Sequence, residues 1–248
     1  MTRHAKKSRE EKIASAAVLV VGAGGLGCAA LLGLARSGIR RLTVVDPDRV
    51  DESNLHRQVL YSDTDIGMPK ALAAKASLET SFPGIDVRAL EARVTSGDVW
   101  DLLDEHDVAI DATDDPATKF LLNDAAVLSE STLVTASAVA WRGHLLTVKP
   151  GHGPCLRCLF EDPPTDAPGC SELGVLGPVP GVLGALEAVE AVKVVTGGGK
   201  TLVGRLLTYE GVSGTFRIVE FDARPDCAVC GDAPTIRSVV DLYAGGAG

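Results

Sequence analysis

Apolar and polar positions divide the first 140 residues into short apolar runs and longer helix-forming stretches. The apolar runs predict strands at residues 17–21, 41–46, 86–90, 107–114 and 133–136. The stretches between them, rich in alanine and leucine, predict helices at residues 28–36, 70–80, 98–105 and 116–129. Because continuously apolar strands separated by helices are buried on both faces, this half predicts a parallel, doubly wound sheet.

The pattern changes after residue 140. Three segments are typical of antiparallel strands, at residues 143–148, 201–210 and 215–220, and a long helix rich in alanine and valine is expected at 181–195. Residues 150–168 are dense in proline, glycine and aspartate, which predicts a loop. The fold class is therefore α/β, a Rossmann-like doubly wound, mostly parallel sheet extended by antiparallel strands.

Composition and charge argue against some classes of binding partner. The chain has 248 residues, and its 24 Lys+Arg against 33 Asp+Glu give a formal net charge of −9. A net negative charge disfavours broad binding to nucleic acid or to anionic membranes. The longest apolar run, residues 14–21, is too short to span a bilayer, and the basic first residues are followed by Glu10 and Glu11 rather than by a leader's apolar region. We therefore expect a cytoplasmic protein with neither a nucleic-acid nor a membrane partner.

A glycine motif opens the first helix. Gly22-x-Gly24-x-x-Gly27 follows the first strand, and Asp46 ends the second strand about 20 residues further on. Such glycines let the backbone approach a phosphate at a helix N-terminus, and such an acid can bind ribose hydroxyls. The motif alone does not distinguish NAD, FAD and ATP.

The residues after Asp46 are less generic, because an ordinary dehydrogenase has no use for them. They include two cations for the charge that shifts onto the β- and γ-phosphates when an α-phosphate is attacked, and an amide for orientation. These residues are Asp48, Ser53, Asn54, Arg57, Gln58 and Lys70. The fourth predicted strand ends in further acids, Asp114 and Asp115, at the sheet edge where a Mg²⁺ ion could bridge to the nucleotide.

The six cysteines fall into two kinds. Four form two Cys-x-x-Cys pairs, Cys155 with Cys158 and Cys227 with Cys230. Two such pairs complete a tetrahedral Zn²⁺ site, so we expect a structural zinc; a redox dithiol is the rival interpretation, disfavoured because neither pair opens a helix of a βαβ unit. Of the single cysteines, Cys28 is expected in the core.

Together these residues resemble the adenylyltransferases of the MoeB/ThiF/HesA type, relatives of the adenylation domain of ubiquitin-activating enzymes. The resemblance covers about residues 15 to 232 and rests on Gly-x-Gly-Gly-Leu-Gly, Asp-x-Asp-x-Val-x-x-Ser-Asn-Leu-x-Arg-Gln, Gly-x-x-Lys-Ala, the Thr-Asp strand end and the cysteine pairs. It implies that Gly25 and Asp46 contact the nucleotide, with Asp46 on the ribose. It also implies that Asn54, Arg57, Gln58 and Lys70 surround the phosphates, that Asp114 holds Mg²⁺ and that the four paired cysteines hold zinc.

The resemblance further implies a reaction and a partner. ATP would adenylate the C-terminal glycine carboxylate of a small ubiquitin-fold sulfur-carrier protein with a Gly-Gly tail, with release of pyrophosphate. Arg57, Lys70 and Asp114 would be catalytic. Cys170 lies where some family members bond covalently to the carrier, and a nucleophile and an incidental exposed thiol both stay open as interpretations. A homodimer is expected.

The same resemblance organises the chain into segments. A polar segment, 1–14, precedes a single adenylation domain, 15–232, and a flexible tail, 233–248, follows it. Within the domain we expect a nucleotide half at about 15–140 and a half with the carrier groove and the zinc site at about 141–232. Since no rhodanese-like domain follows Cys230, a separate sulfur donor is expected.

One feature departs from the family and three rival functions stay open. Family members begin with an Arg-Tyr-x-Arg-Gln helix that supplies an arginine to the neighbouring subunit; this motif is missing, and neither Arg3 nor Arg9 matches it by position. The rivals are an NAD-dependent oxidoreductase, an enzyme of the same fold acting on another substrate (a tRNA-base dehydratase or a peptide adenylyltransferase), and a non-enzymatic scaffold. The complete phosphate site argues against the scaffold.

Overall fold

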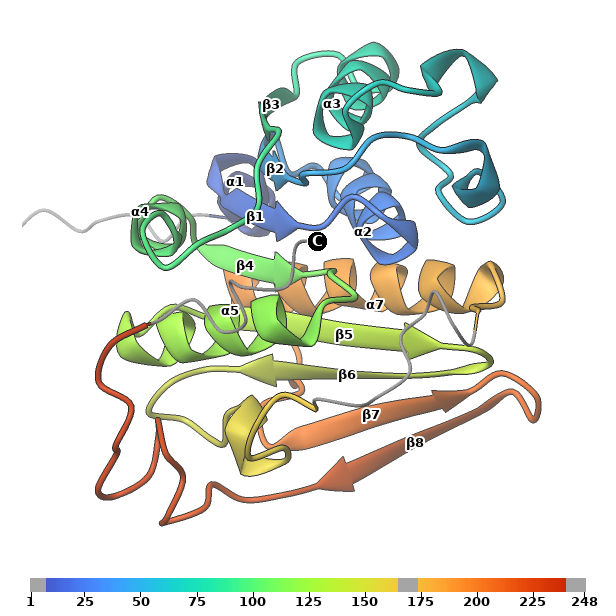
Figure 1. Ribbon diagram of the computed structural model, residues 1–248. Coiled ribbons are helices and arrows are strands. Elements are labelled where there is room, and N and C mark those ends of the chain that lie inside the picture. Colours follow the sequence, from blue (N-terminus) through green and yellow to red (C-terminus); the bar gives the residue numbers. More distant parts are fainter. Residues whose placement is uncertain (1–7, 165–173, 240–248) are drawn as a thin grey trace, which may run out of the picture.

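The computed structural model describes residues 8–164 and 174–239, and within them eight strands form one sheet (Figure 1). The strand order is β3-β2-β1-β4-β5-β6-β7-β8. The first five strands in this order pair in parallel, and β5 to β8 pair antiparallel. The strands are β1 (Ala17–Val21), β2 (Arg41–Val45), β3 (Asp86–Leu90), β4 (Val108–Asp111), β5 (Leu133–Val139), β6 (Arg142–Val148), β7 (Arg205–Glu210) and β8 (Thr215–Glu220).

Helices cover both faces of the sheet, as the pattern predicted. One face packs on α2 (Gly25–Arg36), α3 (Lys70–Ser81) and α7 (Pro178–Thr196). The other packs on α4 (Val99–Asp104), α5 (Pro116–Leu128) and the turn η3 (Leu156–Cys158). The doubly wound, mostly parallel sheet with an antiparallel extension is confirmed.

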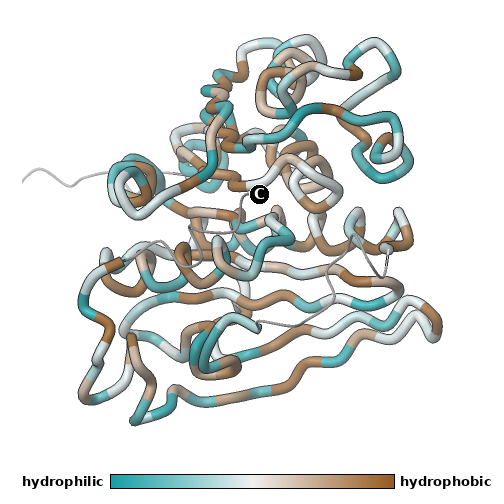
Figure 2. The backbone as a smooth tube through the Cα atoms, in the orientation of Figure 1, coloured by the Kyte–Doolittle hydropathy of each residue, from teal (hydrophilic) through white to brown (hydrophobic). Residues whose placement is uncertain are grey.

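The central strands are buried on both faces. All residues of β1 and β4 are buried, and alternate residues of β1 face different cores, Val20 on the α2 side and Leu19 on the α5 side. Hydrophobic stretches run through these strands in Figure 2, whereas hydrophilic ones dominate the outer loops. This double burial explains why the first half reads as uninterrupted apolar runs.

Some boundaries differ from the sequence prediction. The strand expected at 201–210 begins only at Arg205, and the loop expected at 150–168 contains η3. An unpredicted helix, α1 (Arg9–Ser15), begins within the polar segment 1–14 and starts with a capping box between Ser8 and Glu11. The Nζ atom of Lys12 donates to the Thr196 carbonyl at 2.8 Å, so α1 contacts the end of α7. The Ser-x-x-Glu pattern was the signal for this helix.

Two other expectations concern the C-terminal part. Of the predicted tail, residues 233–239 are described, and Ile236 and Val239 in them pack against the core on the α5 side. Cys170 lies outside the described residues. Among the helices of the described residues, none combines the length and apolar character needed to cross a membrane.

Candidate active site

The glycine loop after β1 and the turn after β4 lie side by side at the carboxyl edge of the sheet. The two strands are parallel neighbours, and Ala112 N donates to the Val21 carbonyl at 2.8 Å. From this edge α2 leaves toward one face and α5 toward the other. Open α/β sheets bind their ligands outside the strand ends at such a change of helix direction, so this edge of the sheet is the candidate ligand site.

Two glycines are required by the shape of this loop. Gly22 has φ +94°, and a Cβ built there would lie 2.7 Å from the Ala112 carbonyl oxygen. A Cβ on Gly27 would lie 1.9 Å from the carbonyl oxygen of Gly22. Neither position accepts a side chain without movement of the backbone, so these glycines are explained by the tight turn itself.

Gly24 and Gly25 instead form the uncapped start of α2. Gly24 is the N-cap and supplies no side-chain hydrogen bond, and the first turn holds no acidic residue. The side chains of Arg57 and Pro180 border Gly25, at 3.5 Å and 3.0 Å from a Cβ built there. An uncapped helix N-terminus with an arginine beside it attracts an anion, because the free amides and the helix dipole both favour negative charge.

Asp46 ties the glycine loop to the segment after β2. It is 5% exposed, and its Oδ2 accepts from Ala23 N at 2.7 Å while its Oδ1 accepts from Asp48 N at 2.8 Å. Burial raises the pKa of Asp46, and these hydrogen bonds and Lys70 oppose that rise. The residue predicted to bind the ribose therefore also holds the loop in shape.

Lys70 and Asp48, both predicted from the sequence, form an ion pair. The Lys70 Nζ lies 2.8 Å from Asp48 Oδ2, and the lysine side chain is only 9% exposed. Lys70 is the first residue of α3, and its amide donates to the Asp48 carbonyl at 2.8 Å. The structure thus brings together a cation and an acid that are 22 residues apart in the chain.

The amide and guanidinium groups expected around the phosphates also cluster. Arg57 Nη2 donates to Asn54 Oδ1, and the Gln58 side chain approaches Gly24. Gln58 is 2% exposed, and its Oε1 has no hydrogen-bond partner among the described residues. Ser53 is exposed, and its hydroxyl donates to Asp51 Oδ1 at 2.5 Å. The roles of these residues toward a nucleotide stay predictions.

The two acids after β4 have different surroundings. Asp114 is exposed and makes no hydrogen bond or ion pair within the described part of the chain. Asp115 caps α5, since its Oδ2 accepts from Thr118 N at 3.1 Å and from Thr118 Oγ1 at 2.5 Å, and it pairs with Arg93 at 3.1 Å. Asp115 is thus engaged in holding α5, whereas Asp114 retains a free carboxylate at the carboxyl edge of the sheet.

Sequence reasoning missed Tyr61. Its buried hydroxyl donates to the Ala23 carbonyl at 2.8 Å and lies 3.2 Å from the Lys70 carbonyl, so it joins the glycine loop to the start of α3. Burial raises the pKa of Tyr61, which keeps the hydroxyl a donor. A single tyrosine in a polar loop carries no pattern that would have revealed this role.

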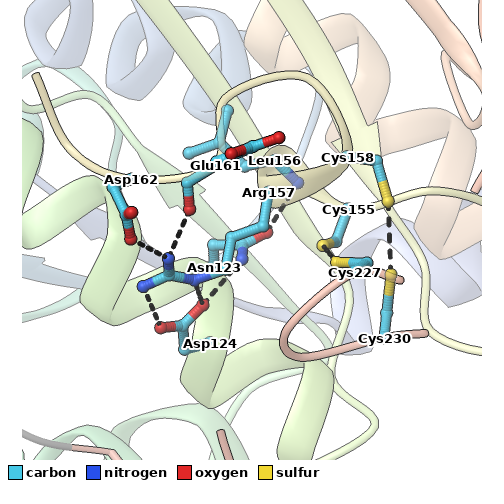
Figure 3. Close-up of polar contacts among 10 residues, drawn as sticks. All are labelled: Asn123, Asp124, Cys155, Leu156, Arg157, Cys158, Glu161, Asp162, Cys227 and Cys230. Atoms are coloured by element: carbon cyan, nitrogen blue, oxygen red, sulfur yellow. Dashed lines mark hydrogen bonds and ion pairs between the residues drawn. The ribbon is translucent and has the colours of Figure 1, made fainter. Parts of the chain in front are cut away.

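The four paired cysteines meet on the other face of the sheet, around η3 (Figure 3). Their Sγ atoms all lie within 4.8 Å of one another, with 3.7 Å between Cys155 and Cys227 and 3.4 Å between Cys158 and Cys230. Tetrahedral zinc with Zn–S bonds of about 2.3 Å places its sulfurs roughly 3.8 Å apart. The donor set and spacing therefore fit a structural zinc ion. Cys28 is buried in the core, as expected.

Buried polar residues of α5 anchor the first cysteine pair, and sequence reasoning missed them. Asn123 Oδ1 accepts from Leu156 N at 2.8 Å, and Asp124 accepts two hydrogen bonds from Arg157, at 2.8 and 2.9 Å (Figure 3). The guanidinium of Arg157 also lies 4.9 Å from the centre of the Phe120 ring. The signal was the polar pair Asn123 and Asp124 between apolar residues of α5.

Comparison with known proteins assigns the chain to a family. The ThiF family model matches residues 1–229. The chain belongs to the ThiF family. It is 44% identical over 242 residues to a protein of Thermus thermophilus named sulfur carrier protein adenylyltransferase, covering 95% of this chain and 89% of the relative. It is 43% identical to adenylyltransferase and sulfurtransferase MOCS3 of Anopheles gambiae, with 93% of this chain covered. The chain spans only 53% of that relative's length.

The fold of this ThiF-family chain also matches a solved structure. The crystal structure of E. coli MccB with ATP superposes with a TM-score of 0.78, covering 90% of this chain and 69% of MccB. The sequence identity is 22%, so this match concerns the fold alone.

Proposed function

We propose that this protein is an ATP-dependent adenylyltransferase that activates the C-terminal glycine carboxylate of a small ubiquitin-fold sulfur-carrier protein. The observation that carries the proposal is the uncapped N-terminus of α2 bordered by Arg57, with the Lys70–Asp48 pair and the free carboxylate of Asp114 after the neighbouring strands. The naming of the 44%-identical relative supports the same substrate class.

The chemistry requires positioning more than proton transfer. A carboxylate oxygen of the carrier's tail would attack the α-phosphorus of ATP in line, the bond from that phosphorus to the bridging oxygen would break, and pyrophosphate would leave with the electron pair. Because the nucleophile is already an anion, no general base is needed. Arg57 and Lys70 would stabilise the charge that develops on the leaving group, and the α2 amides would bind a phosphate.

The chain has residues that fit two metal ions, a Mg²⁺ at the nucleotide and a structural Zn²⁺. Asp114 would hold Mg²⁺, which when bound would neutralise phosphate charge. The four paired cysteines would hold a structural Zn²⁺ that ties the segment before α7 to the C-terminal segment. Asp46 would orient the ribose, with Gln58 and Asn54 facing the phosphates.

The wider setting of the reaction is also a proposal. We expect a homodimer, a separate sulfur donor and a carrier that places its Gly-Gly tail between the candidate nucleotide site and the antiparallel half. The two Cys-x-x-Cys pairs fit a metal site rather than a disulfide framework, and we expect a reducing compartment, the cytoplasm.

The decisive experiment is ATP–pyrophosphate exchange, with each small ubiquitin-fold protein with a Gly-Gly end encoded by the same genome added in turn. Exchange should appear with one of these carriers and disappear when its terminal glycine is deleted. Arg57→Ala should lower the exchange rate about 100-fold, as expected when a group that stabilises transition-state charge is removed. Arg36→Ala, at the far end of α2, is the matched control and should leave the rate unchanged.

Two results would count against the proposal. Absence of exchange with every carrier would remove it. Tight binding of NAD without exchange would favour the oxidoreductase instead.

A further inference from the structure

A carboxylate outside the predicted site lies directly beneath the turn that presents Asp114. Asp111, the last residue of β4, is fully buried. Its Oδ1 accepts from the amide of Thr113 at 3.2 Å and from the Thr113 hydroxyl at 2.7 Å. Its Oδ2 accepts from Lys119 Nζ at 3.0 Å and from Thr135 Oγ1 at 2.6 Å. One oxygen therefore holds the turn and the other is held by the surrounding core.

Lys119 connects this carboxylate to the rest of the fold. It lies on α5, its side chain is 10% exposed, and its Nζ also donates to the Ala136 carbonyl of β5 at 2.6 Å. The helix that carries it starts at the Asp115 cap, one residue after Asp114. The turn of residues 112–115 is thus held from below by Asp111 and from its far end by α5.

Stability alone does not explain the buried Lys119–Asp111 ion pair, because an apolar pair of similar volume often stabilises a core as well or better. Two further ionisable groups face this pair, His144 of β6 and Glu187 of α7. Glu187 is fully buried, and neither of its carboxylate oxygens has a hydrogen-bond partner among the described residues. Burial raises the pKa of Glu187 well above its ordinary value, and the charge of Lys119 opposes that rise. The geometry links the pair to the turn, because Lys119 holds one oxygen of Asp111 while the other oxygen holds Thr113.

We propose that Lys119 is a positioning residue for adenylation, which through Asp111 holds the turn of residues 112–115 in the conformation that presents Asp114 to the candidate nucleotide site. This inference rests on the proposed function. A metal-binding carboxylate has to be held within about 0.5 Å of its productive position by neighbours that are themselves locked. Asp114 has no partner of its own to hold it within the described residues, so the hold comes from the turn beneath it.

The test compares Lys119→Met with Lys119→Arg and with Leu122→Ala. Leu122 is fully buried on the same helix and belongs to the apolar core, so its truncation weakens α5 without touching the Asp111 carboxylate. Two readouts are used: hydrogen exchange of the amides of residues 112–115, and the dependence of ATP–pyrophosphate exchange on Mg²⁺ and ATP.

For Lys119→Met we expect hydrogen exchange of the amides in the turn to accelerate about tenfold, because Asp111 loses the contact that holds it against the turn and the turn opens more often. The Mg²⁺ concentration for half-maximal activity should rise about tenfold and kcat should fall about tenfold, as for a misplaced metal-binding group. KM for ATP should change less than about threefold, because α2, Arg57 and Lys70 remain in place. Lys119→Arg should restore most of these values, and Leu122→Ala should lower the unfolding temperature without changing them.

Unchanged amide exchange in the turn, or equal changes in Leu122→Ala, would overturn the positioning role. If Lys119→Met does not fold, the double variant Asp111→Asn with Lys119→Met, which leaves no buried charge at this position, takes its place with the same expectations. Failure of the wild-type protein to catalyse exchange with any carrier would remove the proposed function alone, because the amide-exchange comparison still decides whether Lys119 holds the turn.

Discussion

The parallel and antiparallel halves of the sheet are stabilised by different means. In the parallel half, β1 and β4 are buried along their whole length between α2 on one face and α5 on the other. In the antiparallel half, β8 is largely exposed, and Phe216, Ile218 and Val219 are each at least half exposed. Burial of apolar strands holds the first half. In the second half only β6 is buried to a similar extent, and α7, the polar anchors and the cysteine cluster add to its stability.

This difference shows how the two candidate sites depend on their surroundings. The candidate nucleotide site is built from turns that follow the largely buried strands β1, β2 and β4, so its geometry follows from the core. The cysteine cluster joins η3 to a C-terminal segment that forms no helix or strand among residues 221–239. A metal ion there would close a long loop and so restrict the unfolded chain, as a disulfide does.

Loss of the metal is therefore expected to be among the largest effects. Cys227→Ser should lower the zinc content and cost about 4 kcal/mol of unfolding free energy, by analogy with the loss of a cross-link that closes a long loop. At roughly 2–4 °C per kcal/mol for a chain of this size, the unfolding temperature should fall by about 8–16 °C. Metal analysis and thermal unfolding measure both quantities.

Cys28→Ala is the matched control, because it removes a buried thiol outside the cluster. It should retain the zinc. Equal destabilisation by the two variants would contradict the contrast between the halves.

The second prediction concerns the parallel half. Gly27→Ala should cost about 2–3 kcal/mol and weaken ATP binding at least about tenfold, because a Cβ cannot approach a carbonyl oxygen without displacing the backbone. That Cβ would lie 1.9 Å from the Gly22 oxygen. Gly181→Ala on α7, where a Cβ meets nothing within 4 Å, should be neutral or slightly stabilising. Titration with ATP and thermal unfolding distinguish the two variants, and tight ATP binding by Gly27→Ala would show that the loop is not rigid.

The third prediction concerns Glu187 on α7, the helix that spans both halves. Its pKa is raised in the folded state, so folding favours its protonated form, and stability falls as pH rises above the ordinary value of 4.5 toward the folded one. Glu187→Gln removes this loss, and its advantage in unfolding temperature over the wild type should be larger at pH 8 than at pH 5. Glu79→Gln, an exposed acid on α3, should show no such trend. A pH-independent difference for Glu187→Gln would mean that Glu187 is ionised in the fold.

The smallest effect is expected at the surface of the parallel half. Arg93 pairs with Asp115, but the two side chains are 64% and 37% exposed. Arg93→Ala should change the unfolding free energy by less than about 1 kcal/mol, as is usual for exposed pairs, whereas breaking a buried pair by Arg157→Met should cost about 3–5 kcal/mol. Urea unfolding of the two variants tests the difference, and similar values would argue against the anchoring role of Arg157 at the cysteine cluster.

Local patterns predicted the strands of the parallel half and the two sets of candidate ligands. A strand that is buried on both faces needs an uninterrupted run of apolar residues, and a tight loop needs glycine. Both requirements can therefore be recognised in the sequence. Paired cysteines mark a metal site for a similar reason, because two ligands from one turn need a short fixed spacing. The helix α1 was missed although its Ser-x-x-Glu cap was present.

By itself the sequence determined which residue types occupy the strand ends and the tight turns, because the constraints on strands and turns act over a few neighbouring positions. Only the tertiary structure decided which polar groups meet: Tyr61 on the Ala23 carbonyl, Lys119 on Asp111 and Arg157 on Asp124. It also separated Asp114 from Asp115, giving the first a free carboxylate and the second a helix cap. These contacts join separate elements, and a buried polar side chain reveals its partner only once the chain has folded around it.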